Sequence, residues 1–136
     1  MLRNILGAIA GLIIGGIVNM GLIMISSSVI PPPAGVDMTT VEGLTAAMPM
    51  LEPKHFVFPF LAHALGTFFA ALVATMIAVS HKMTIGIVIG VLFLIGGIAA
   101  SMMIPAPTWF KVLDLIVAYI PMALLGARLG GAGKTT

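Results

Sequence analysis

Two ionisable side chains inside apolar segments are the strongest candidates for chemistry in this sequence. His63 stands in the run Phe-Pro-Phe-Leu-Ala-His-Ala-Leu-Gly, and Asp114 is followed by Leu-Ile-Val-Ala. In a segment long enough to cross a bilayer, a titratable group is costly, so it marks a functional site or a polar contact between helices. These two residues are therefore the first candidates for a functional site.

Two neutral polar residues are expected to support this pair. Asn19 lies near the middle of the first apolar segment, and Thr67 follows His63 by one helical turn. The spacing predicts that these side chains face the same helix contacts as His63 and Asp114. A purely structural interpretation stays open, with His63 bonded to Asn19 or Thr67, Asn19 in a simple interhelical hydrogen bond, and Asp114 paired with Lys111 at the interface.

Glu52 and His55 are expected to form a vestibule above His63. The spacing Glu52-x-x-His55 places a carboxylate and an imidazole about one turn apart. Such groups can relay protons, and together with His63 they could hold a divalent cation such as Zn²⁺. No other cofactor is expected.

Two prolines lie inside the expected spans. Pro59 and Pro121 each leave the carbonyl four residues earlier, of His55 and Val117, without its helical partner. Inside the membrane, such a carbonyl needs a partner from protein, water or an ion. We therefore expect helix breaks that support a polar cavity.

The composition identifies an integral membrane protein. Of 136 residues, 60% are hydrophobic and 7% are charged, whereas about 25% are charged in a typical soluble domain. The lipid bilayer is thus the expected partner, and a net charge of +2 gives no reason to expect nucleic acid. Because the chain has no cysteine, disulfides and thiolate metal sites are excluded.

Four apolar stretches predict an all-α fold, an antiparallel four-helix transmembrane bundle in a single domain, 1–136. The expected spans are 5–30, 55–80, 83–104 and 108–128, and the first is expected to be retained rather than cleaved as a signal peptide. The outer loop, 31–54, should contain a short surface helix, because Thr39 to Glu42 fits a capping box.

The distribution of cations predicts the orientation. Two basic residues, Lys54 and Lys111, border the expected outer loops, and four others lie at the opposite end: Arg3, Lys82, Arg128 and Lys134. The positive-inside rule then places both termini in the cytoplasm. The expected location is the cell (inner) membrane.

Rows of small residues indicate which helix faces pack together. They are Gly7, Gly11 and Gly15; Gly66, Ala70 and Ala74; and Gly86, Gly90 and Gly97. Small residues allow close helix approach in lipid. The glycine-rich faces could also join subunits of a homo-oligomer.

The leading hypothesis is binding or movement of a small cation or proton through an outward-facing polar cavity. The alternative is a non-catalytic scaffold, an assembly factor or a lipid-binding subunit whose polar core is structural. A Ser-His-Asp hydrolase built from Ser101, His63 and Asp114 is the weakest option, because no nucleophile motif surrounds Ser101. We therefore do not expect an enzyme. Tyr119, about 140° around a regular helix from Asp114, is expected to pack or to lie at the interface rather than to join the site.

The segment from Glu52 to Thr67 (EPKHFVFPFLAHALGT) and the run Gly-Gly-Ile-Val-Asn-Met at 15–20 carry a resemblance. They are similar to segments of small uncharacterised bacterial four-span membrane proteins. The resemblance implies the four-span fold and no particular activity.

Overall fold

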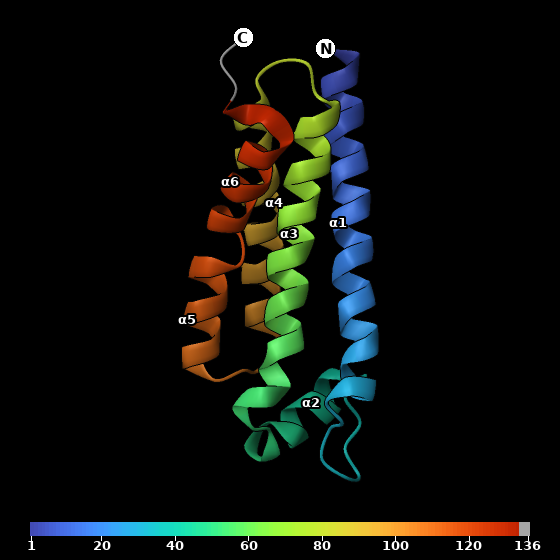
Figure 1. The fold of residues 1–136 in the computed structure, drawn as a ribbon. Helices are drawn as coiled ribbons and strands as arrows, with labels where there is room; N and C mark the ends of the chain where they lie inside the picture. The colour runs from blue at the N-terminus through green and yellow to red at the C-terminus, as the bar shows by residue number, and fades with distance from the viewer. Residues whose placement is uncertain (134–136) are drawn as a thin grey trace.

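The computed structural model describes residues 1–133, and they form an antiparallel bundle of helices (Figure 1). Its elements are α1 (Leu2–Val29), α2 (Val41–Ala47), α3 (Val57–Ile77), α4 (Lys82–Met103), α5 (Thr108–Val117) and α6 (Ile120–Ala127). A 3₁₀ turn, Pro53–Phe56, leads into α3, and a π-helical segment, Arg128–Ala132, follows α6. The all-α bundle with a short helix in the first loop is confirmed.

In the described part of the chain, four helical stretches are long and apolar enough to cross a membrane: Leu2–Val29, Pro53–Ile77, Lys82–Met103 and Thr108–Ala132. These stretches indicate a small multi-pass membrane protein with four spans. Both ends of the described chain and the α3–α4 turn lie at one end of the bundle, and α2 lies at the other (Figure 1). Lys134, one of the cations used to predict orientation, lies outside the described residues.

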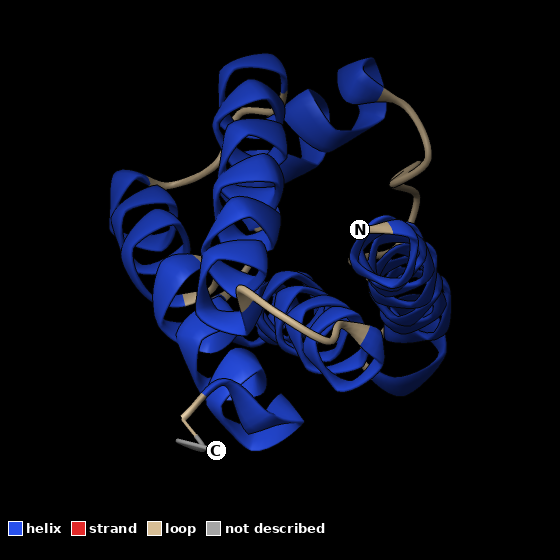
Figure 2. Ribbon diagram, turned by 90° about the horizontal axis from the view of Figure 1, so that it is seen from above, coloured by secondary structure: helices blue, strands red, loops and turns tan. Residues whose placement is uncertain are grey.

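Helix α3 is the centre of the bundle, and it packs against α1, α4, α5 and α6. Helix α1 stands at one side (Figure 2) and meets the rest of the bundle mainly through α3. Its three buried residues are the glycines of the first small-residue row, Gly7, Gly11 and Gly15. Each lies against an α3 backbone carbonyl, so this row brings the two main chains into direct contact.

The other small-residue rows pack within the chain in the same way. Gly86 and Gly90 of α4 lie against Ala127 and Ala123 of α6, and Gly126 lies against the carbonyl of Phe68. Buried alanines of α3 and α6 fill the centre of this half of the bundle. In the half nearer the two termini, glycine and alanine thus form the closest helix contacts, and Ile89 and Thr75 are buried beside them.

The cap of α2 differs from the expected one by one residue. Thr40, not Thr39, is the N-cap, and its Oγ1 accepts the N–H of Gly43 at 3.0 Å. Thr39 instead donates its hydroxyl and its N–H to the carboxylate of Asp37. These bonds, the hydroxyl first, hold the pKa of Asp37 below its usual value. The competing acceptor two residues earlier explains the shift, because Asp readily closes such local turns.

The two prolines behave differently. Pro59 lies in the first turn of α3, where a missing N–H would have no helical partner in any case, so the break expected inside this span does not occur. At Pro121 the break is present. Helix α5 ends at Val117, α6 begins at Ile120, and Tyr119 between them has a non-helical backbone (φ −110°, ψ −81°).

The glycine contact between α1 and α3 predicts a position-specific effect. We expect Gly15→Ala to lower the free energy of unfolding by about 1–3 kcal/mol, because the added methyl overpacks the contact. The new methyl would meet the carbonyl of Gly66 and the side chains of Ala70 and Phe93. The measurement is unfolding in mixed micelles with increasing dodecyl sulfate, followed by circular dichroism.

Gly16→Ala is the matched control, because a methyl there meets no atom within 4 Å. Replacing this exposed helical glycine should be neutral or stabilise by up to about 1 kcal/mol through helix propensity. Equal destabilisation by both changes would contradict the packing account.

Candidate functional site

The candidate site is built around a pair formed by His63 of α3 and Asp114 of α5. Each residue lies six positions after the first residue of its helix (63 − 57 and 114 − 108). Both helices begin at the end that carries α2 (Figure 1). At about 1.5 Å per residue, each side chain therefore lies about 9 Å along its helix. At this shared depth, His63 Nδ1 lies 2.9 Å from both carboxylate oxygens of Asp114.

Tyr119 completes the group, contrary to the expectation that it packs or lies at the interface rather than joining the site. Its hydroxyl donates to Asp114 Oδ2 at 3.1 Å, and its ring stacks on His63 with centroids 5.7 Å apart. The expectation assumed one regular helix through 114–121. The break before Pro121 turns the Tyr119 side chain back towards Asp114, so this proline two residues later was the signal that could have revealed it.

The hydrogen bonds define the roles of the atoms. The Asp114 side chain is 6% exposed, and as a carboxylate it accepts from the Tyr119 hydroxyl and from His63 Nδ1–H. This assigns the proton of neutral His63 to Nδ1 and leaves the Nε2 lone pair free.

The free nitrogen is not sealed inside the protein. The His63 side chain is 23% exposed, and Nε2 makes no hydrogen bond within residues 1–133. In this part of the chain no buried side-chain nitrogen or oxygen lacks a partner, so Nε2 lies at the accessible surface. The arrangement can thus accept and return a proton at one defined atom.

The predicted supporting residues lie close to the pair but do not bond its side chains. Thr67 Oγ1 donates to the backbone carbonyl of His63 at 2.7 Å. Asn19 packs against Gly66 at the α1–α3 contact. Within the described residues, the His63 ring therefore bonds to Asp114 and not to the side chain of Asn19 or Thr67, whereas Thr67 bonds to the His63 backbone alone.

Lys111 and Ser101 form a separate contact. Lys111 Nζ donates to the carbonyl of Ser101 at 2.7 Å rather than to Asp114, so the pairing considered for Lys111 and Asp114 is wrong. The hydroxyl of Ser101 donates to the carbonyl of Ile98 in its own helix at 2.7 Å. In the described chain, Ser101 is thus not a hydrogen-bond partner of His63.

Glu52 and His55 have structural contacts at the start of the second span. The N–H of Glu52 donates to His55 Nδ1 at 2.9 Å, and His55 Nε2 lies 3.2 Å from the carbonyl of Pro31. With Nδ1 accepting, Nε2 carries the proton and donates, so the ring ties the outer loop to α3. The Glu52 carboxylate pairs with Lys54 Nζ at 3.3 Å.

The metal site predicted from Glu52, His55 and His63 is not assembled. Within residues 1–133, no three His, Asp or Glu side chains lie close enough together to hold a metal ion. Both ring nitrogens of His55 have partners. His63 lies eight residues further along, about 12 Å of helical rise away.

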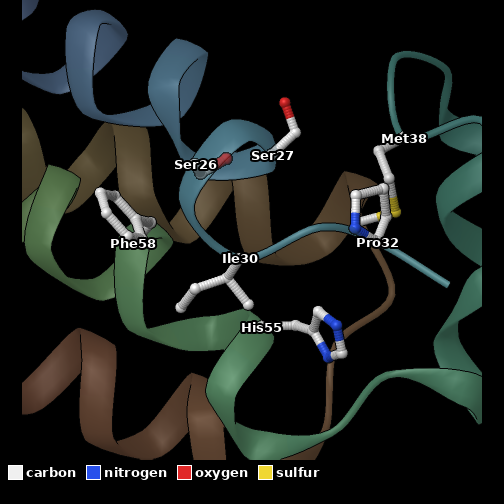
Figure 3. A pocket seen from close by; sticks show the side chains of 7 residues that line it. All are labelled: Ser26, Ser27, Ile30, Pro32, Met38, His55 and Phe58. Atoms are coloured by element: carbon white, nitrogen blue, oxygen red, sulfur yellow. The ribbon is translucent and has the colours of Figure 1, made fainter.

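A small pocket of about 50 Å³ lies beside His55, which forms part of its wall (Figure 3), but Glu52, the other residue expected in the vestibule, is not in its lining. Its lining comes from the end of α1, the following loop and the start of the second span: Ser26, Ser27, Ile30, Pro32, Met38, His55 and Phe58. It has room for a water molecule. His63 is not part of its lining, so this pocket does not extend to the pair.

Gly97 of α4 sets the position of Tyr119, and this predicts how the site can be disturbed. A methyl on Gly97 would collide with the Tyr119 hydroxyl and ring. We expect Gly97→Ala to weaken the Tyr119–Asp114 hydrogen bond and to lower the free energy of unfolding by about 1–3 kcal/mol. Tyr119 is the single tyrosine of the chain, so ultraviolet resonance Raman spectra report its hydrogen bond directly.

Gly96→Ala serves as the control, because a methyl at Gly96 meets nothing within 4 Å. Its tyrosine spectrum should match that of the wild type. An unchanged spectrum in Gly97→Ala would show that Gly97 does not position Tyr119.

Comparisons with known proteins identify no relative of this chain. No family model, no curated protein and no solved structure matches the chain. The resemblance of the segment Glu52 to Thr67 to small bacterial four-span proteins stays a prediction. The candidate site therefore depends on its own geometry: a histidine held by a buried carboxylate and a tyrosine inside a four-span bundle.

Proposed function

We propose that the protein binds a proton at the His63–Asp114–Tyr119 group and passes it on within the membrane. The observation that carries the proposal is the free, accessible Nε2 of a histidine whose Nδ1 is held by a buried carboxylate. In this proposal His63 is the proton acceptor, Asp114 its counter-ion, and Tyr119 the donor that fixes the carboxylate.

Charge balance supports a proton as the ligand. With neutral His63, the group carries the single negative charge of Asp114. A proton on Nε2 converts it to an ion pair with no net charge, which is the less costly state to hold away from water. The same atoms could attract a small metal cation, but the described residues supply no third acidic or imidazole ligand beside them.

The packing supports exchange of the proton on the side of the outer loop. Towards the termini, the contacts of Gly86 with Ala127 and of Gly90 with Ala123 close the bundle. Release on that side would require a rearrangement. The joint between α5 and α6 is suited to one, because its backbone is already outside the helical hydrogen-bond pattern.

The charge distribution supports an orientation with both termini in the cytoplasm. Arg3, Lys82 and Arg128 lie at the end of the bundle that holds the termini, whereas Lys54 and Lys111 lie at the other. The positive-inside rule then makes the outer loop extracytoplasmic and locates the protein in the cell membrane.

Proteoliposomes that contain a pH-sensitive dye test the proposed function. After a pH jump with the membrane potential clamped, vesicles with the wild-type protein should relax faster than empty vesicles. His63→Gln should reduce the rate to the level of empty vesicles, because glutamine offers no proton-binding nitrogen. His81→Gln is the control, since His81 is exposed in the α3–α4 turn.

Equal relaxation by wild type and His63→Gln would remove His63 from any proton path. Relaxation no faster than in empty vesicles for the wild-type protein would refute proton movement altogether.

A structural scaffold is the second candidate, and the pairing of the buried polar side-chain atoms favours it. Within residues 1–133 no buried side-chain nitrogen or oxygen lacks a hydrogen-bond partner, as a network that only fixes helix register requires. The scaffold account predicts no proton flux in the wild type and a loss of about 3–5 kcal/mol of stability when His63 is replaced. The dodecyl sulfate titration described above measures that loss.

A further inference from the structure

The end of the bundle that holds both termini contains an open pocket of about 850 Å³, separate from the His63 group. Three basic residues contribute to its wall: Arg3 of α1, His81 of the α3–α4 turn, and Lys82 at the start of α4. Apolar side chains contribute another part of the wall, with Met76, Val79 and Leu129 among them. The pocket thus combines two cations, Arg3 and Lys82, with hydrocarbon in one depression at the boundary of the apolar helices.

The cations in this pocket have no acidic side chain to neutralise them. The sequence contains four acidic residues: Asp37, Glu42, Glu52 and Asp114. The first three lie in the loop at the opposite end, and Asp114 is bonded to His63 and Tyr119. Among residues 1–133, the hydrogen-bond partner of Lys82 Nζ is neutral, the carbonyl of Gly130 at 3.4 Å. The positive potential of the pocket therefore stays available to an anion.

Hydrogen bonds hold the walls of the pocket together. The side-chain oxygen Oδ1 of Asn4 accepts the N–H of Val79 at 3.0 Å, and its side-chain nitrogen Nδ2 donates to the hydroxyl of Ser80 at 3.0 Å. These bonds fasten the start of α1 to the α3–α4 turn, which brings Arg3 and Lys82 to one pocket. The cations are thus positioned by the fold and not merely attached to mobile ends.

We propose that this pocket binds the phosphate of an anionic phospholipid headgroup, such as that of phosphatidylglycerol. Charge complementarity accounts for the headgroup. The apolar wall selects a lipid over free phosphate, because Met76 and Leu129, which are 62% and 65% exposed, offer surface to acyl chains. A small soluble anion would leave that surface unused.

Lipid binding can be measured with spin-labelled phosphatidylglycerol and spin-labelled phosphatidylcholine in vesicles of phosphatidylcholine that contain the protein. The wild type should immobilise the anionic lipid preferentially. In the double variant Arg3→Gln/Lys82→Gln the preference should fall by about 30-fold, since each basic side chain near an anionic headgroup contributes about a fivefold factor.

Two further variants make the result specific. Lys54→Gln/Lys111→Gln removes the same charge at the opposite end and should retain the preference. Arg3→Lys/Lys82→Arg keeps the charge and should also retain it, which separates lost charge from disturbed packing.

Three results would overturn the proposal: no preference in the wild type, an equal loss in Lys54→Gln/Lys111→Gln, or displacement of the lipid by millimolar inorganic phosphate. The last would show a phosphate site that does not use the apolar wall. The assay reads lipid binding alone, so its outcome is independent of proton flux through His63.

Discussion

The need to partner the Asp114 carboxylate away from water is the constraint on which this bundle depends. A carboxylate in the interior is tolerated only when hydrogen-bond donors surround it, and the bilayer core supplies none. The protein supplies two, from His63 on α3 and from Tyr119 at the α5–α6 joint. The hydrogen bonds to Asp114 therefore fix the depth of α3 relative to α5 and the backbone at the α5–α6 joint.

Small residues determine how closely the other helix pairs pack, because the apolar helices have no hydrophobic drive to associate in lipid. Glycines bring α1 against α3 and α4 against α6, at distances that a methyl group would disrupt. Gly97 connects this packing to the polar group, since Tyr119 lies directly against it. The position of α4 thus determines whether the tyrosine hydroxyl can reach Asp114.

The sequence was sufficient to predict the four spans and to single out the two residues of the polar pair, because both predictions depend on local composition. An apolar stretch with one ionisable group identifies His63 and Asp114 without any knowledge of packing. Residue identity could not indicate which group pairs with which. His55 shows this: it is as suitable a ligand as His63 by type, yet its ring ties Glu52 to the carbonyl of Pro31.

Predictions that assumed regular geometry failed where a neighbouring group competed. Thr39 was the expected N-cap of α2, but its hydroxyl donates to Asp37, and Thr40 is the N-cap instead. Pro59 was expected to break a helix inside its span, whereas α3 begins only two residues before it. In each case the error was a shift of a few residues in where a helix begins, which periodicity alone does not determine.

Tyr119 is the most informative of these differences, because here the irregularity creates the site. In a continuous helix the five residues from Asp114 to Tyr119 would rotate the two side chains about 140° apart. The non-helical backbone at Tyr119 removes that separation and lets its hydroxyl reach Oδ2. The helical hydrogen bond that Pro121 cannot donate is thus exchanged for a donor to a buried carboxylate. A regular fourth span would leave Asp114 with His63 as its partner and no hydroxyl to hold its second oxygen.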